Sequence, residues 1–454
     1  MTRIRTRPEP MPAESHQGLR GVGAIDAVWM LTVYLILLIA LPSNLAITAL
    51  GAYGRPQFLW GLVLFAWWVV VRLQTPSVAV RPIRQPLKVA LGILIVVALL
   101  GFAQALLRGQ PFDQISPSIS ALLRLASWTG VALVAMDGIR TVNDLSRMAR
   151  RIALAAGALA ALGILQFLTG TTIVDAFTSL PGFTGGVAGI DERGGFTRAS
   201  GTATHPLEYA TALSIGFPLA IATAVNAATR PGRSARDRAM WLVVALIAVA
   251  SFIAVSRSAV IGFVVAVIAT IPAVPRRWRL AVVLAGLVLA AGTALAVPGL
   301  YGTIVGMFLW FGTDPSSQSR IAGLEFATRL VSESPLFGSG IGTFLPRYYI
   351  FDNQWAQLTV EMGIAGVLAF AVLFATAVWS AGTAGALSPF EDIRVLGRAL
   401  AASMVVAAVL YALFDGLAFP ISSGLAFLIL GLCGAARLVG VTDRRLDDAL
   451  RRVA

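Results

Sequence analysis

This chain of 454 residues has little of the charge that soluble proteins carry. Charged residues make up 13% of it, about half the share of a typical soluble domain, whereas 57% of its residues are hydrophobic. So few charges cannot cover the water-exposed surfaces of the roughly three domains that its length would allow. The composition excludes a soluble multidomain protein and a disordered or fibrous chain, and it indicates an integral membrane protein.

Cysteine, histidine and lysine are almost absent. Cys433, the single cysteine, lies in an apolar stretch, which excludes a disulfide framework and a cysteine-based metal site. The two histidines, His16 and His205, are far apart and the sequence has no Asp-x-Asp pair, so we expect no metal and no cofactor. The sequence also lacks G-x-x-x-x-G-K-[ST], so nothing predicts a nucleotide site.

Apolar stretches long enough to cross a bilayer, which takes about 20 helical residues, recur along the chain. They predict an all-α polytopic membrane domain at 27–437 with about twelve transmembrane helices. The run 240–274 would be about 50 Å long as one helix, against a hydrocarbon core of about 30 Å, so it must fold back at Ser256-Arg257-Ser258. The expected spans are 27–47, 56–72, 89–107, 118–136, 152–170, 206–228, 240–255, 258–274, 280–297, 355–380, 398–414 and 419–437.

Basic residues predict the orientation of these spans. If the N-terminus is cytoplasmic, the cytoplasmic segments contain 26 of the 35 Lys and Arg residues, as the positive-inside rule requires. The net charge of +13 therefore reflects topology and does not indicate a nucleic-acid partner. Both termini are expected in the cytoplasm, as a flexible tail at 1–26 and a C-terminal tail at 438–454. The amphipathic stretch 141–151 is expected to form a short separate helix at the membrane surface.

Two segments on the opposite side, about 171–205 and 298–354, are long enough to build a site. Nine basic residues remain on that side or inside spans, where the positive-inside rule disfavours them. Such residues are candidates for binding an anion, because guanidinium gives planar, bidentate contacts to phosphate and keeps its charge. The nine are Arg55, Arg108, Arg124, Arg193, Arg198, Arg257, Arg320, Arg329 and Arg347.

Three of these arginines are the most informative. Arg124 lies in the outer half of a span, where burying an arginine costs up to about 2.5–3.5 kcal/mol and such residues face a polar cavity. Arg257 lies between two serines at a hairpin tip, which favours an anion site over a helix-end anchor. Arg320 falls in the first turns of a helix expected to begin at Pro315, where a bound anion would offset the unfavourable helix dipole. Their convergence would predict binding of a phosphate or diphosphate.

Four short motifs follow one another in the second half of the chain. They read R-x-x-G-x-x-x-x-P at 198–206, S-R-S at 256–258, Arg320 followed by P-L-F-G-S-G-I-G-T-F at 335–344, and D-N-Q-W at 352–355 followed by E-M-G-I-A-G at 361–366. In this order they resemble the O-antigen ligase and O-antigen polymerase (Wzy-type) superfamily of bacterial membrane glycosyltransferases. The resemblance covers about 193–380, and the twelve-span layout extends it over the whole chain.

The resemblance implies a GT-C-like fold and a metal-independent reaction outside the cytoplasm, at the bacterial inner membrane. A glycan on a polyprenyl diphosphate would be transferred to an acceptor hydroxyl on a glycan or lipid, with Arg198, Arg257 and Arg320, joined by Arg124, on the diphosphate. Fixed cations there would stabilise the charge of the leaving diphosphate. We expect a surface-polysaccharide polymerase; an en bloc ligase to a lipid, protein or wall acceptor is the close alternative, and a lipid-linked-glycan flippase is less favoured.

The general base is where the sequence departs from the family. Family ligases usually carry His before the Asn of the last motif, whereas this chain has Asp352, and a carboxylate can do the same work. Asp352 is therefore the leading candidate for the base. His205 is the alternative, although the following Pro206 favours an ordinary helix start. Asn353 fits a helix cap, and Glu361 fits a structural partner of an arginine.

Overall fold

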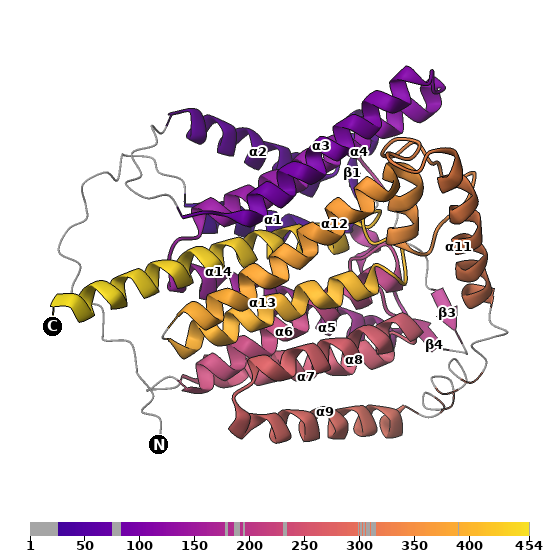
Figure 1. Cartoon of the computed structure of the whole chain (residues 1–454). Coiled ribbons are helices and arrows are strands. Elements are labelled where there is room, and N and C mark those ends of the chain that lie inside the picture. The colour runs from indigo at the N-terminus through magenta and orange to yellow at the C-terminus, as the bar shows by residue number, and fades with distance from the viewer. Residues whose placement is uncertain are drawn as a thin grey trace.

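The computed structural model describes residues 26–74, 83–177, 180–185, 191–193, 196–229, 234–297, 315–388 and 390–453, with 299, 302, 305 and 309 singly. The described chain is a bundle of long helices that run roughly side by side (Figure 1). Within it, eight helices are long and apolar enough to cross a membrane, and two shorter apolar helices, Ala27–Ile39 and Arg257–Ala273, accompany them. The protein is an all-α polytopic membrane protein, as its composition predicts.

Each of the twelve expected spans overlaps a helix, although the helix in the expected span 27–47 ends at Ile39. The helices are α1 (Ala27–Ile39), α2 (Pro56–Gln74), α3 (Pro86–Leu107), α4 (Phe112–Gly138), α5 (Val142–Thr169), α6 (Pro206–Thr229), α7 (Ala235–Ile253), α8 (Arg257–Thr270), α9 (Arg276–Ala296), α12 (Gln354–Leu387), α13 (Glu391–Leu410) and α14 (Pro420–Val453). The 240–274 run does fold back before Arg257, because α7 ends at Ile253 and Val255 takes a left-handed φ of 43°.

One sequence expectation about the start of a helix is wrong. Residues 142–151 form no separate surface helix but are the first turns of α5, and Val142, Leu145 and Met148 are buried against the rest of the protein. Their apolar side faces protein, so the amphipathic pattern reflects packing. Residues 438–453, which belong to the expected C-terminal tail, are helical and continue α14. The expected tail at 1–26 lies outside the described residues apart from Asp26, which caps α1.

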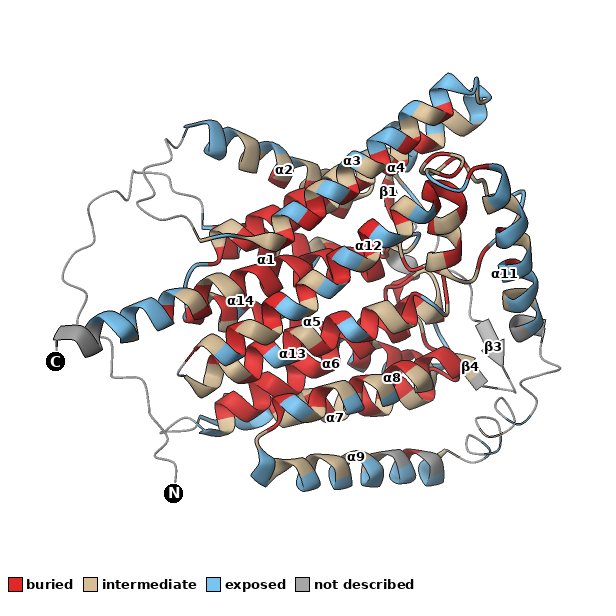
Figure 2. Ribbon diagram, viewed as in Figure 1, coloured by how far each residue is buried: buried red, intermediate tan, exposed pale blue. Residues whose placement is uncertain are grey.

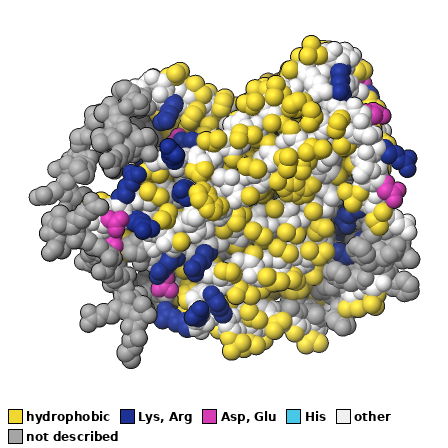
Figure 3. Space-filling view, in the orientation of Figure 1, with side chains coloured by type: hydrophobic (Ala, Val, Ile, Leu, Met, Phe, Trp, Pro, Cys, Tyr) yellow, Lys and Arg dark blue, Asp and Glu magenta, His cyan; other side chains and the backbone are white. Residues whose placement is uncertain are grey.

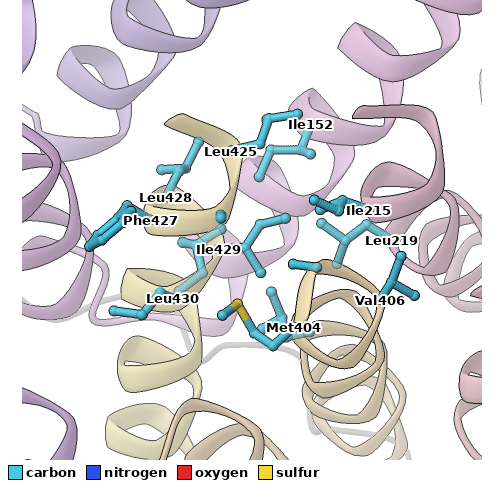
Figure 4. Close-up of a cluster of buried hydrophobic side chains, with 14 of the residues drawn as sticks. Ile152, Ile215, Leu219, Met404, Val406, Leu425, Phe427, Leu428, Ile429 and Leu430 are labelled. Atoms are coloured by element: carbon cyan, nitrogen blue, oxygen red, sulfur yellow. The ribbon is translucent and has the colours of Figure 1, made fainter. Parts of the chain in front are cut away.

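The core lies along the centre of the bundle, where α6 and the apolar part of α14 are largely buried, whereas α9 is largely exposed (Figure 2). Apolar side chains from α5, α6, α13 and α14 meet there (Figure 4). Small residues let these helices approach closely: a Cβ on Gly431 of α14 would touch the backbone of Ala132 in α4. Such close packing is how helices associate in a bilayer, which offers no hydrophobic driving force between them.

The two ends of the bundle differ in chemistry. Lys and Arg side chains gather at the end where α14 finishes, and an apolar band covers the middle (Figure 3). The opposite end, here called the α11 end, carries the extra helix α11 (Pro315–Glu333) and two short antiparallel strand pairs. The pairs are β1 (Ala46–Ile47) with β2 (Phe183–Thr184), and β3 (Asp191–Arg193) with β4 (Phe196–Arg198); the 3-10 turns are η1 (Thr48–Tyr53), η2 (Val174–Phe177) and η3 (Ile271–Ala273).

A buried carboxylate on α6 joins three segments at the α11 end. Glu208 is 0% exposed and accepts hydrogen bonds from Ser43 Oγ at 2.9 Å, the Thr204 N–H at 3.0 Å and the Ile421 N–H at 2.6 Å. The third donor is one of the N–H groups at the start of α14 that have no partner within the helix. Glu208 therefore fixes the ends of α1, α6 and α14 relative to one another.

A second buried carboxylate holds the glycine-rich segment 338–342 against α12. Glu361 accepts the N–H groups of Gly342 and Phe344, while its own carbonyl accepts the Gly340 N–H at 2.8 Å. Just beyond it α12 is kinked at Gly363, with φ 64° and ψ −165°, a conformation open essentially to glycine alone. The N–H of Ile364 then donates to Pro335 O at 2.9 Å. The two sequence motifs at 335–344 and 361–366 are thus one packed unit.

We expect Gly363→Ala to lower the free energy of unfolding by about 3 kcal/mol or more, because its backbone is strained for alanine and a Cβ would collide with the Leu336 carbonyl. Gly382→Ala is the matched control: it lies on the same helix with no atom within 4 Å of the new Cβ, and it should be neutral or stabilising by about 0.5–1 kcal/mol. Thermal unfolding of the purified variants in detergent measures both. Equal melting temperatures would contradict the packed-unit assignment.

Replacing Glu208 by Ala should destabilise the protein by about 2–4 kcal/mol, because the buried Ile421 and Thr204 N–H groups lose their carboxylate acceptor. Glu208→Gln keeps one acceptor oxygen and should cost less. The control is Glu325→Ala on the exposed surface of α11, which should stay within about 0.5 kcal/mol of wild type. The same unfolding measurement applies, and a Glu208→Ala variant as stable as the control would disprove the role of this carboxylate.

Candidate functional site

The loop between α13 and α14, residues 411–419, lies next to Asp352, His205 and the pocket that contains Arg124. The start of α12 is docked on it by its backbone: the Gln354 N–H donates to Tyr411 O at 2.8 Å and Phe414 O at 3.1 Å. In return, the Leu417 N–H donates to Gln354 Oε1 at 2.8 Å. Asn353 caps α12, as its position indicates, by accepting the N–H groups of Trp355 and Ala356. Asp352, two residues before Gln354, is therefore held close to this loop.

Asp352 is half-buried and faces a second carboxylate across this junction, Asp415 of the α13–α14 loop. Burial raises the pKa of Asp415 to about 7, a hydrogen bond to its own backbone opposes the shift, and the negative charge of Asp352 adds to it. Near neutral pH, Asp415 therefore exchanges its proton readily beside the leading base candidate. Paired carboxylates whose proton affinity lies near the working pH are suited to proton transfer.

Sequence reasoning missed Asp415. One signal could have found it, because Asp415 is the only charged residue between Arg398 and Arg437, and it stands at the turn between the last two spans. A lone carboxylate in so apolar a stretch is costly unless it has a partner or a function. Nothing in the local sequence indicates that Asp415 lies close to Asp352, which is 63 positions earlier in the chain.

His205 begins α6 and contacts the same loop. Its Nδ1 accepts the Leu207 N–H at 3.1 Å, and its ring centroid lies 5.9 Å from that of Phe419. The hydrogen bond is the kind that satisfies a helix start, as the neighbouring Pro206 indicates.

Arg198 stands at the other end of the loop that leads to His205. It is the last residue of β4 and pairs in register with Asp191 of β3. The loop is clamped by Gln166 of α5, whose Oε1 accepts the Ser200 N–H at 3.2 Å and the Gly201 N–H at 2.7 Å. Gly201 adopts a φ of 60°, so the glycine of the first motif makes the turn between Arg198 and α6.

Arg257 is the first residue of α8 and is buried, with 4% of its side chain exposed. Gly262, farther along α8, packs against Leu410 at the end of α13 and Ser214 of α6. Since α8 begins at the end of the bundle where α13 finishes (Figure 1), Arg257 lies about 7.5 Å farther along the axis, toward the α13–α14 loop. The helix N-terminus there adds partial positive charge to that of the guanidinium.

Arg320 is carried by α11, which begins at Pro315 as expected. Asp314, whose position directly before this proline fits an N-cap, lies outside the described residues. An aromatic cluster of Phe326, Phe344, Tyr349 and Phe351 packs α11 against the segment that leads into Asp352. Tyr349 Oη donates to Ser319 O at 2.7 Å, and Gly323 lies against the rings of Tyr349 and Phe351. Three residues before Gly323, Arg320 shares this face of α11.

Arg124 lies apart from these three arginines, in a pocket of about 410 Å³. The pocket is formed by α1, the start of α2, the outer turns of α4 and the α13–α14 loop, and it also contains Arg55. Among the described residues, Arg198, Arg257 and Arg320 do not line it. The structure thus separates Arg124 from the other predicted arginines and joins it to Arg55. Arg55 was one of the nine basic residues outside the cytoplasmic segments, but its sequence context did not single it out.

Within the described ranges, no three His, Cys, Asp or Glu side chains come together in a way that could hold a metal ion. The chemical groups available at the α11 end are guanidinium groups, the Asp352–Asp415 pair and the imidazole of His205. Guanidinium groups bind and stabilise phosphate charge, and a carboxylate accepts the proton of a hydroxyl. Together these groups can support transfer from a phosphate-activated donor to a hydroxyl.

Comparison with known proteins agrees with this chemistry. No curated protein matches the chain. Residues 242–371 match the family model described as O-antigen ligase, and they include Arg257, Arg320, Asp352 and both halves of the packed unit. The match supports a glycosyltransferase role of the O-antigen ligase and polymerase type. The chain therefore combines eight candidate membrane spans with a segment, residues 242–371, that is similar to the O-antigen ligase family.

Proposed function

We propose that this protein transfers a glycan from a polyprenyl-diphosphate donor to an acceptor hydroxyl, as a surface-polysaccharide polymerase. The observation that carries the proposal is that the matched domain contains two arginines and a carboxylate that the fold directs to one end of the bundle. Arg257 is buried toward the α13–α14 loop, Arg320 lies on the α11 face packed beside Asp352, and Asp352 is held on that loop.

In this reaction, the bond between the sugar's anomeric carbon and the diphosphate oxygen breaks, and the acceptor oxygen takes its place. Negative charge grows on the leaving diphosphate, where Arg198, Arg257 and Arg320 stabilise it without a metal ion. The proton of the acceptor hydroxyl passes to Asp352 with Asp415 beside it, and His205 is the alternative acceptor. The glycan therefore gains one sugar linkage and the lipid keeps its diphosphate.

The proposed orientation places the α11 end outside the cytoplasm and both termini inside. It rests on the basic side chains that gather at the opposite end of the bundle (Figure 3). With this orientation, the donor's diphosphate meets the arginines at the outer face while its lipid stays in the bilayer. The family description favours a ligase as the second candidate, since a ligase uses the same donor and differs in its acceptor.

The purified protein supplied with a lipid-linked repeat unit should produce a ladder of products with increasing numbers of repeats. Gel analysis of the labelled glycan measures this. A polymerase uses the repeat unit as both donor and acceptor, so no other acceptor is required. Transfer of a single unit, and only after a separate lipid or protein acceptor is added, would replace the polymerase with the ligase.

Arg257→Ala and Arg320→Ala should each lower kcat of transfer by about 10²–10³-fold, because each removes a cation that stabilises the leaving diphosphate. Arg329→Ala is the matched control: it lies on the same helix as Arg320 but is exposed, and it should keep wild-type activity. Product formation from labelled donor measures all three. The assignment of Arg257 and Arg320 to the diphosphate is wrong if the control loses as much activity as the other two variants, or if all three stay active.

Activity should rise with pH up to about 7 and then level off, because Asp415 must be ionised to take over the proton that Asp352 accepts from the acceptor hydroxyl. The pKa of Asp415 is raised, so its ionised fraction falls about tenfold for each pH unit below 7. Asp415→Asn should abolish this limb of the profile, and Asp352→Asn should abolish activity. An unchanged pH profile in Asp415→Asn would remove Asp415 from the mechanism.

A further inference from the structure

The pocket of Arg55 and Arg124 is a cavity at the α11 end that the transfer chemistry leaves without a function. Its volume of about 410 Å³ falls within the usual range for small-ligand sites, about 300–1,000 Å³. One wall belongs to the α13–α14 loop, through Leu417 and Ala418. The same loop carries Asp415, so the pocket and the proposed reaction centre share one loop.

The two guanidinium groups of the pocket have no ion pair within the part of the chain that the structure describes. Arg55 experiences the charge of Glu208 through space, and Arg124 that of Glu361. Both carboxylates, however, already accept hydrogen bonds from backbone N–H groups, as described above. Two cations in one partly apolar cavity repel each other, and an anion bound between them would relieve this cost.

Two buried polar atoms of the pocket lining have no hydrogen-bond partner among the described residues: Nε of Arg124, a donor, and Oε1 of Gln57, an acceptor. Gln57 is only 5% exposed, and its Nε2 donates to Ser43 O at 3.1 Å, so the orientation of the amide is fixed. Unpaired buried polar atoms are rare in native proteins and need an explanation. A ligand that brings both an anionic acceptor and a hydroxyl donor would satisfy both atoms.

Aromatic rings supply the rest of the recognition surface. Tyr34, Tyr53, Phe58 and Trp128 line the pocket, and Trp128 is held in place by stacking on Phe427 with centroids 5.2 Å apart. Rigid ring faces beside a few polar groups are typical of sites that bind small cyclic ligands. A phospholipid phosphate would use the arginines but would leave the Gln57 acceptor without a donor unless its head group carries one.

We propose that this pocket binds an acidic sugar residue of the glycan substrate, with its carboxylate or phosphate between Arg55 and Arg124, a hydroxyl donating to Gln57 Oε1, and the ring against the aromatic side chains. The inference rests on the proposed glycan transfer and specifies its substrate class: the glycan handled by this chain contains an acidic sugar next to the reacting linkage.

The test is binding of glucuronate to the full chain in phosphatidylcholine nanodiscs, measured by saturation-transfer NMR titration. Glucuronate should bind at least tenfold more tightly than glucose. Arg124→Gln should weaken glucuronate binding about ten- to hundredfold and Gln57→Leu about tenfold, as expected for losing one hydrogen bond to a charged group and one to a neutral group. Arg329→Gln, an exposed arginine outside the pocket, is the control and should bind like wild type.

Variants that fail to fold are recognised by gel filtration, and Arg124→Lys then replaces Arg124→Gln: it keeps the charge, lacks the Nε donor and should still weaken binding. Equal binding of glucose and glucuronate, or equal binding by the variants and wild type, overturns the proposal. Inorganic phosphate competing as well as glucuronate overturns the sugar assignment and leaves an anion site. Displacement of glucuronate by phosphatidylglycerol added to the nanodiscs identifies a lipid head group instead.

Arg257→Ala separates this inference from the proposed function. This variant should lose transfer yet bind glucuronate like wild type, because Arg257 does not line the pocket. If Arg257→Ala loses transfer and the wild type binds no glucuronate, the proposed sugar-binding role of the pocket is refuted and the proposed reaction still stands. Glucuronate binding by wild type together with full transfer by Arg257→Ala would refute the proposed reaction and leave the pocket standing.

Discussion

The α11 end depends on the pairing of its backbone hydrogen-bonding groups, which a membrane protein cannot leave to water inside the bundle. Three irregular segments meet there, at 199–205, 335–353 and 411–419. The buried carboxylates of Glu208 and Glu361 accept the N–H groups that regular helices would otherwise have paired. Because each carboxylate joins segments distant in sequence, the ends of α1, α6, α12 and α14 are held in one arrangement.

This pairing also explains why two arginines remain available in the pocket. A carboxylate whose oxygens already accept backbone hydrogen bonds can lower the free-energy cost of burying a nearby cation by Coulombic attraction. It does so without forming a salt bridge with that cation. Arg55 and Arg124 are tolerated in the bundle in this way, beside Glu208 and Glu361, while their guanidinium groups still line a cavity. Structural carboxylates and ligand-binding arginines are thus two parts of the same electrostatic arrangement.

The sequence predicts what local chemistry determines. Helix length and the thickness of the bilayer require the fold-back before Arg257, Pro315 begins α11, and Asn353 caps α12. Prediction from the sequence fails where one pattern has two possible physical causes, or where interacting residues are far apart in the sequence. The amphipathic start of α5 suits a membrane surface as well as a protein core, and only tertiary packing decides between them. The pairing of Asp352 with Asp415, and of Arg124 with Arg55, comes from helix packing that no spacing encodes.

The two proposed sites belong to different parts of the chain. The residues proposed to act on the donor lie mostly within the matched segment 242–371, whereas the pocket is built from α1, α2 and α4 and lies outside it. One place where they meet is the α13–α14 loop, which carries Asp415 and lines the pocket with Leu417. A change of sugar at the pocket would therefore leave the diphosphate-binding arginines in place. In such an arrangement, substrate choice can vary from one chain to another while the chemistry of transfer stays the same.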